Sequence, residues 1–137
     1  MIVLDTNVLS EATKAAPDQR VQAWFAANQD LLWLPSVALA ELRGGAALMV
    51  GGKRRDALEE QFDAIEHTYS ERLLDFDAPS SRYYALVLES AKKAGKPIST
   101  ADAMIAAIAR QHGMSVATRD LGDFAGADVP LINPWDA

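Results

Sequence analysis

The chain has 137 residues, half of them hydrophobic, and a formal net charge of −6. These values predict a single domain over residues 1–137 and exclude a disordered protein. The absence of cysteine excludes a disulfide framework and a thiolate zinc site, and no apolar run approaches the roughly 20 residues of a membrane span. Because its start shows no signal-peptide pattern, we expect a cytoplasmic protein.

The order of apolar runs and helical patterns predicts an α/β fold. Strands are expected at residues 1–5, 31–34, 73–76, 114–118 and 130–132. Helices are expected at 18–28, 53–69, 79–94 and 100–112, and a further helix is expected to begin after an N-cap at Ser36. The chain is expected to bend near 46–50, a segment with a pair of glycines on either side. Strands that alternate with helices are typical of a parallel sheet covered on both faces, here a three-layer α/β/α sandwich with about five strands.

Four acidic residues stand where this fold would bring them together: Asp5, Glu41, Asp102 and Asp120. Asp5 and Asp120 follow the first and fourth predicted strands, and the other two lie near the starts of predicted helices. In a parallel sheet the strands end and the helices begin at the same edge. We therefore expect the four carboxylates to meet at that edge.

Each acid also has a structural interpretation. Asp5 suits a capped polar turn, Glu41 suits a solvated helix face, and Asp102 suits the third helical position of a capping box. For the fourth position we favour Asp120, because it directly follows the strand, and keep Asp123 as the second choice. The functional interpretation therefore depends on the four acids being taken together.

A divalent cation would explain why so many carboxylates converge. Two carboxylates about 4 Å apart repel by roughly 4 kcal/mol at an effective dielectric constant near 20. Several such pairs would approach the stability of a whole domain. A site built only of oxygen atoms selects Mg²⁺ or Mn²⁺. His67 and His112 share no motif with the acids and are interpreted as structural.

Five short segments, in this order along the chain, carry a family resemblance. They are IVLDTNVLSE (2–11), SVALAEL (36–42), ISTADAMIA (98–106), ATRD (117–120) followed by Asp123 and Phe124, and INPW (132–135). Together they resemble PIN-domain ribonucleases, specifically the VapC-type toxins of prokaryotic toxin–antitoxin pairs and their FitB-like group. The resemblance covers essentially the whole chain.

The resemblance implies a PIN fold and cleavage of RNA that depends on Mg²⁺ or Mn²⁺. It implies an acidic quartet with supporting polar residues, which fall on Asp5, Glu41, Asp102 and Asp120 and on Thr6, Asn7 and Thr118. It also implies a homodimer and a cognate antitoxin whose tail covers the site. Residues 83–86 are a candidate dimer face.

The charges suggest how such a site would act. We expect Asp5 and Asp102 to anchor a first ion, with Glu41 and Asp120 completing its shell or holding a second ion. Hydrolysis is expected to leave a 5′-phosphate and a 3′-hydroxyl. Single-stranded or loop RNA is the expected substrate, with contacts from one of two arginines, Arg43 or Arg119.

Two alternatives remain at this point. A signalling receiver domain has a similar size and sheet, but it would need a lysine after the fifth strand, where this chain has Asn133 and Pro134. A PIN-like protein that only binds a partner is a different class. The presence of all four acids disfavours that alternative.

Overall fold

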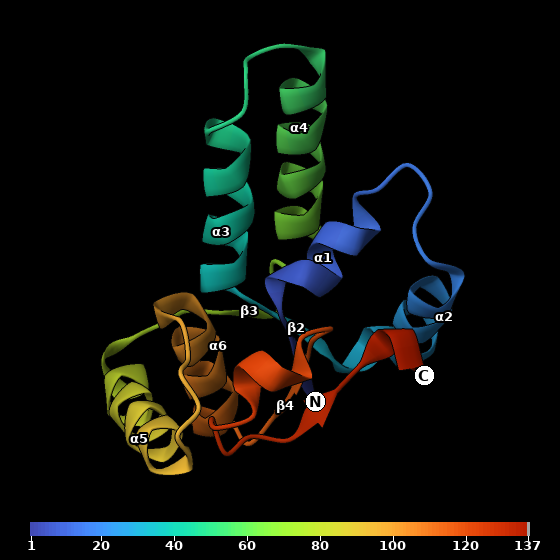
Figure 1. Cartoon of the computed structure of the whole chain (residues 1–137). Helices are drawn as coiled ribbons and strands as arrows, with labels where there is room; N and C mark the ends of the chain where they lie inside the picture. Colours follow the sequence, from blue (N-terminus) through green and yellow to red (C-terminus); the bar gives the residue numbers. More distant parts are fainter. Residues whose placement is uncertain (137) are drawn as a thin grey trace.

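The computed structural model describes residues 1–136, and at its centre lies a parallel sheet of five strands (Figure 1). The strand order is β3-β2-β1-β4-β5. The strands are β1 (Ile2–Leu4), β2 (Leu32–Pro35), β3 (Leu73–Leu74), β4 (Ser115–Ala117) and β5 (Leu131–Ile132). The predicted α/β sandwich with about five parallel strands is confirmed, and the predicted strand positions are confirmed with somewhat shorter bounds.

The central strand β1 determines where a site can form. Ile2 lies opposite Leu32 of β2 on one side and Ser115 of β4 on the other. After β1 the chain continues to β2 and β3 on one side, and only later crosses to β4 and β5 on the other side. The strand order therefore reverses at β1. Ligands of open parallel sheets bind in the crevice at such a point, beyond the carboxyl ends of the strands.

Helices cover both faces of this sheet. The helices are α1 (Thr6–Ala12), α2 (Gln19–Asn28), α3 (Ser36–Ala47), α4 (Lys53–Thr68), α5 (Ala78–Ala94) and α6 (Thr100–Gln111), with short 3₁₀ turns η1 (Gln29–Leu31), η2 (Leu121–Phe124) and η3 (Pro134–Asp136). In Figure 1, α5 and α6 lie to one side of the sheet, and α1 and α2 lie to the other. The apolar helix α6 is the most deeply buried, with the run from Ile105 to Ala109 fully enclosed.

The helices α3 and α4 form a hairpin that stands away from the carboxyl edge of the sheet (Figure 1). The two helices are joined by the Arg43 guanidinium, which lies 2.9 Å from the Asp63 carboxylate and 2.8 Å from that of Glu66. Among residues 1–136, no helix is long and apolar enough to cross a membrane.

Three details differ from the sequence-based predictions. Ser36 is not the N-cap of α3, because Pro35 holds that position and Ser36 is already helical. The bend predicted near residues 46–50 is confirmed in its second half, since the chain turns at residues 48–52, but α3 continues through Gly44 and Gly45 to Ala47. Finally, α1 was not predicted, because Asp5 and the two residues after it suggested a turn.

Candidate active site

Asp5 is the most enclosed acid at the carboxyl edge of the sheet. It is 5% exposed, and its Oδ1 atom accepts a hydrogen bond of 2.8 Å from the Thr6 backbone N–H, which makes it the N-cap of α1. Its Oδ2 atom accepts a hydrogen bond of 2.8 Å from the Thr118 hydroxyl. Burial raises the pKa of Asp5 to about 6 despite these hydrogen bonds, and the nearby charges of Asp102 and Glu41 raise it further.

Thr118 connects three members of the site through one fully buried hydroxyl. This hydroxyl donates to Asp5 and accepts from the backbone N–H of Asp120 at 3.0 Å and from Nδ2 of Asn7 at 3.4 Å. A buried hydroxyl with this many partners has one stable orientation. Thr118 therefore fixes the position of Asp5 relative to the loop after β4.

Asn7, in the first turn of α1, holds Asp120. Its Oδ1 atom accepts a hydrogen bond of 3.3 Å from the Arg119 backbone N–H, so its Nδ2 group points to the other side. That group donates to Oδ2 of Asp120 at 3.0 Å. The side chains of α1 and the loop after β4 are thus connected directly across the sheet edge.

Glu41 reaches the site from α3 and has a single anchor. The Thr6 hydroxyl donates to its Oε1 atom over 2.5 Å. Glu41 is exposed, unlike its apolar neighbours Leu39 and Leu42, which are buried in the core. The helix therefore faces the core with its apolar side while this one carboxylate lies over the end of β1.

Asp102 enters from the first turn of α6. Its backbone N–H donates to the Ser99 hydroxyl at 3.2 Å, so the predicted capping arrangement is confirmed. Burial raises the pKa of the half-buried Asp102 carboxyl, and the charges of Glu41, Asp123 and Asp120 raise it further. A side-chain hydrogen bond with Ser99 partly offsets this rise in the pKa of Asp102, while the carboxyl stays close enough to the other acids to be affected by their charge.

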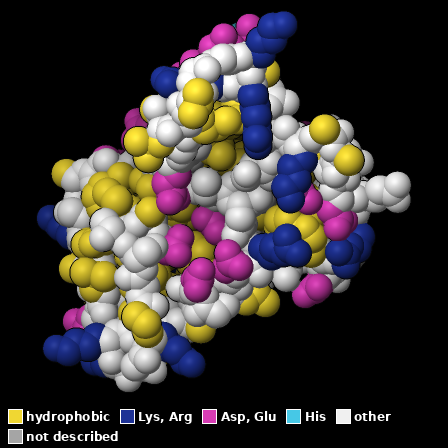
Figure 2. Space-filling view, turned by 45° about the horizontal axis from the view of Figure 1, so that its top comes forward, with side chains coloured by type: hydrophobic (Ala, Val, Ile, Leu, Met, Phe, Trp, Pro, Cys, Tyr) yellow, Lys and Arg dark blue, Asp and Glu magenta, His cyan; other side chains and the backbone are white. Residues whose placement is uncertain are grey.

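Asp120 and Asp123 both lie close enough to Asp102 for their charges to raise its pKa. Within residues 1–136, only the Asp120 side chain is hydrogen-bonded to another residue of the site, Asn7, whereas Asp123 contacts the site through its backbone N–H, which donates to the Asp120 carbonyl. Both side chains are exposed, and Asp123 lies in the 3₁₀ turn η2. We call the group Asp5, Glu41, Asp102 and Asp120 the acidic centre, with Asp123 at its border. Figure 2 shows acidic side chains gathered around an open hollow on this face of the molecule.

Other candidate residues differ in how they relate to this centre. The charge of Arg43 is occupied by two carboxylates of α4, which raise the pKa of Arg43 and direct it into the hairpin. Arg119 has its guanidinium 5.0 Å from the centre of the Trp135 ring, directly beside the loop that carries Asp120. His67 and His112 are exposed and make no hydrogen bond with the acids.

The main feature that sequence reasoning missed is α1 as the support of the site. Thr6 and Asn7 were expected as polar neighbours, but not as two side chains in one helical turn that hold Glu41 and Asp120. The available signal was Asp5 itself, since Asp is a strong N-cap residue.

Comparison with known proteins places the chain among closely similar sequences. Residues 2–129 match the family model of the PIN domain. The chain is 44% identical over 137 residues to "Toxin FitB" of Neisseria gonorrhoeae, covering 98% of this chain and 99% of the relative. It is 46% identical over 138 residues to "VapC ribonuclease Y4jK" of Sinorhizobium fredii, with 99% of each covered.

A solved structure agrees with these sequence relatives. The chain in the structure of FitAB bound to the IR36 DNA fragment is 44% identical and superposes with a TM-score of 0.90. The similarity covers 98% of this chain and 96% of that one. The fold and the sequence therefore point to the same family over nearly the full length.

Proposed function

Because the chain belongs to the PIN domain family, we propose that it is a divalent-metal-dependent endoribonuclease and the toxin of a toxin–antitoxin pair. The observation that carries this proposal is the acidic centre itself. Four carboxylates from separate parts of the chain share one hollow, and burial and mutual repulsion raise the pKa of Asp5 and of Asp102. Such an arrangement is costly unless a cation offsets it.

The residues present fit a hard divalent cation. All four side chains of the acidic centre offer carboxylate oxygens, which suit Mg²⁺ or Mn²⁺. Within residues 1–136, no three Asp, Glu, His or Cys side chains are arranged to hold one ion by direct ligation alone. Mg²⁺ usually keeps several waters and takes one or two carboxylates directly, so a partly hydrated ion suits this arrangement.

Asp5 and Asp102 are the residues that would hold the ion, with Glu41 and Asp120 as further oxygen ligands, directly or through water. A bound divalent cation lowers the pKa of water and offsets charge on a phosphate. The protein's own contribution is to fix the carboxylates. Asp5 is held by Thr118 and by the start of α1, while Asn7 directs the Asp120 side chain toward the hollow.

RNA is the substrate that the family relationship supports, since the Sinorhizobium relative is named a ribonuclease. The hollow is open and shallow (Figure 2). A single-stranded or loop segment can present its backbone there more readily than a duplex can. We propose hydrolysis that leaves a 5′-phosphate and a 3′-hydroxyl.

The proposed partners are a cognate antitoxin and a second copy of the chain. One relative is named a toxin, and its structural counterpart is a FitAB complex on DNA, which supports a partner protein that binds DNA. The exposed part of α5 around Leu86, which is 46% exposed, supports a face for dimer formation near residues 83–86.

The experiment is RNA cleavage by the purified chain with Mg²⁺ or Mn²⁺. Asp5→Asn and Asp102→Asn should each lose at least about a hundredfold in rate, because several kcal/mol of metal-derived stabilisation would disappear. Asp30→Asn is the matched control, since Asp30 is an exposed residue of η1 at the other end of β2. Wild-type rates in either centre variant, or cleavage unaffected by chelation, would contradict the proposal.

A further inference from the structure

A groove of about 530 Å³ opens between α1 and α4, and its lining includes Ser10 of the helix that carries Thr6 and Asn7 of the site. Its lining contains two cations, three neutral polar side chains and no carboxylate: Lys14 and Arg54, then Ser10, Thr13 and Gln61, with Ala15, Ala57 and Leu58. The chain as a whole has 19 acidic and 13 basic residues. A groove without acids therefore departs from the general charge of this protein.

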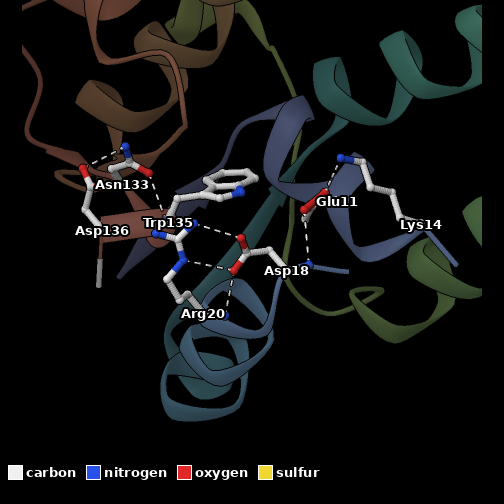
Figure 3. A network of polar contacts seen from close by, with 7 residues as sticks. All are labelled: Glu11, Lys14, Asp18, Arg20, Asn133, Trp135 and Asp136. Carbon is white, nitrogen blue, oxygen red and sulfur yellow. Dashed lines mark hydrogen bonds and ion pairs between the residues drawn. The ribbon is translucent and has the colours of Figure 1, made fainter. Parts of the chain in front are cut away.

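Lys14 presents its charge outward. Its ammonium lies 2.6 Å from the Glu11 carboxylate (Figure 3), but the two partners differ greatly in exposure. The Lys14 side chain is 57% exposed, and the Glu11 side chain only 6%. The buried carboxylate thus fixes the lysine from below, while the cation remains open to a ligand in the groove.

Arg54 supplies a charge that is not used inside the protein. It is exposed in the first turn of α4, and within residues 1–136 no carboxylate lies within ion-pair distance of it. Its neighbour Arg55, by contrast, is paired with Glu59 at 2.9 Å. A free arginine in a groove without acids is suited to a phosphate.

The groove is joined to the acidic centre through α1. This helix carries Thr6 and Asn7 of the site in its first turn, and Ser10 and Thr13 of the groove further along. At 1.5 Å per helical residue, Thr13 lies about 10 Å along the axis from Thr6. Figure 2 shows basic side chains on one side of the acidic hollow.

Arg119 belongs to the loop after β4, and its backbone N–H donates to Asn7 of the site. Its guanidinium rests on the Trp135 ring, which is 5% exposed. Figure 3 places Trp135 beside the Asp18–Arg20 pair and on the same side as Glu11 and Lys14.

We propose that this groove is the path of the RNA backbone on one side of the cleavage site, with phosphates held by Lys14 and Arg54. The inference rests on the proposed nuclease function and adds the direction in which the substrate leaves the acidic centre. Hydroxyl and amide groups next to two cations are typical phosphate contacts that carry no base preference. Continuity with the acidic centre along α1 favours RNA over an acidic protein segment as the occupant.

The test measures binding separately from cleavage. A fluorescent single-stranded RNA of mixed sequence is titrated with protein in EDTA, where no metal-dependent cleavage occurs, at several salt concentrations. The variant is Lys14→Ala with Arg54→Ala. The matched control is Lys92→Ala with Lys93→Ala, which removes two exposed cations from the last turn of α5. Because α5 begins just after β3, at the carboxyl edge of the sheet, its last turn lies near the opposite edge, away from the acidic centre.

The groove variant should bind RNA roughly tenfold more weakly at low salt, and its slope of log K against log salt should fall by about 1.4, or about 0.7 for each phosphate that is no longer neutralised. The control should match wild type. Equal binding by both double variants would overturn the path. The same titration is made with poly-glutamate in place of RNA. If the groove variant loses affinity only for poly-glutamate, the groove belongs to an acidic protein partner and the RNA path is overturned. Failure of the nuclease itself is read separately, as absent cleavage with Mn²⁺ by a wild-type protein that still binds RNA.

Discussion

The acidic centre has two halves that are held very differently. On the strand side, Asp5 and Asp120 are connected through Thr118 and Asn7 by hydrogen bonds to backbone and side chains. On the helix side, Glu41 is exposed and has one hydroxyl partner. Asp102, also on the helix side, is held through Ser99, which caps its backbone N–H and forms a hydrogen bond with its carboxyl.

This difference separates two tasks of the proposed cation site. The strand half is fixed before any ligand arrives, so it determines where an ion and a phosphate would lie. The helix half can adjust its side chains, which suits ligands that bind through water. Substitution of a residue that positions the strand half should therefore lower the cleavage rate more than substitution of one that positions the helix half or lies outside both.

The largest effect is expected from the fourth acid. Asp120→Asn should slow Mn²⁺-dependent RNA cleavage at least about a hundredfold, because it removes a charge that Asn7 holds toward the hollow. Asp123→Asn should stay within about threefold of wild type. Initial rates on one labelled RNA measure both. The reverse order would place the fourth ligand in η2 and remove Asp120 from the strand half.

The second-largest effect is expected from Thr118→Val, which should lower the rate of RNA cleavage by about 10- to 100-fold. A loss of this size is typical of residues that orient metal ligands. Valine keeps the volume of this fully buried side chain but leaves Asp5, Asn7 and the Asp120 backbone without their shared partner. Thr118→Ser retains the hydroxyl and should recover most of the rate. Equal rates for Val and Ser would show that the hydroxyl does not organise the strand half.

A third effect concerns stability in the absence of divalent ions. The folded protein holds a proton on Asp5 up to about pH 6, whereas the unfolded chain releases it near 3.8. The stabilisation from this group is therefore present below about pH 4 and is lost as the pH rises to about 6, on the order of 2 to 3 kcal/mol.

Urea unfolding in EDTA at pH 4 and pH 7.5 measures this loss. Asp5→Asn should lack most of the pH dependence and should be more stable than wild type at pH 7.5. The control Asp30→Asn should keep the wild-type dependence. If Asp5→Asn keeps the wild-type pH dependence, burial of the Asp5 charge does not limit the stability of the strand half.

The smallest effect is expected on the helix side. Thr6→Val removes the one hydrogen bond that the Glu41 side chain makes within residues 1–136. It should reduce cleavage less than about fivefold, because an exposed carboxylate can reach the hollow without it. The comparison with Thr118→Val uses the same assay. A reduction for Thr6→Val as large as that for Thr118→Val would show that both halves are equally fixed.

The sequence predicted the parts of this site that depend on position along the chain. Asp5 and Asp120 follow apolar strands, and Asp102 begins a helix too apolar to be exposed, so topology alone brings them to one edge. The strands and the helix 53–69 were recognisable because their apolar residues recur at regular spacing.

Contacts between distant residues could not be predicted in this way. Asn7 is paired with Asp120 across 113 residues, and the partners of Arg43 lie on α4, 20 and 23 residues away. The helix α1 was missed because seven residues give little periodic signal after an Asp that also suits a turn. Gly44 and Gly45 did not break α3, since apolar packing by Leu42 and Ala46 outweighs their low helix propensity.

The hydrogen bond between Asp5 and Thr118 joins residues that are 113 positions apart. The central strand β1 also lacks its β4 neighbour until residues 115–117 are available. During synthesis from the N-terminus, Asp5 and Glu41 therefore leave the ribosome long before Thr118 is available to close the strand half. Non-local pairing of this kind forms late in folding. Completion of the acidic centre is thus tied to the end of translation, and a chain cut short before β4 has Asp5, Glu41 and Asp102 but lacks Asp120 and the Thr118 hydroxyl.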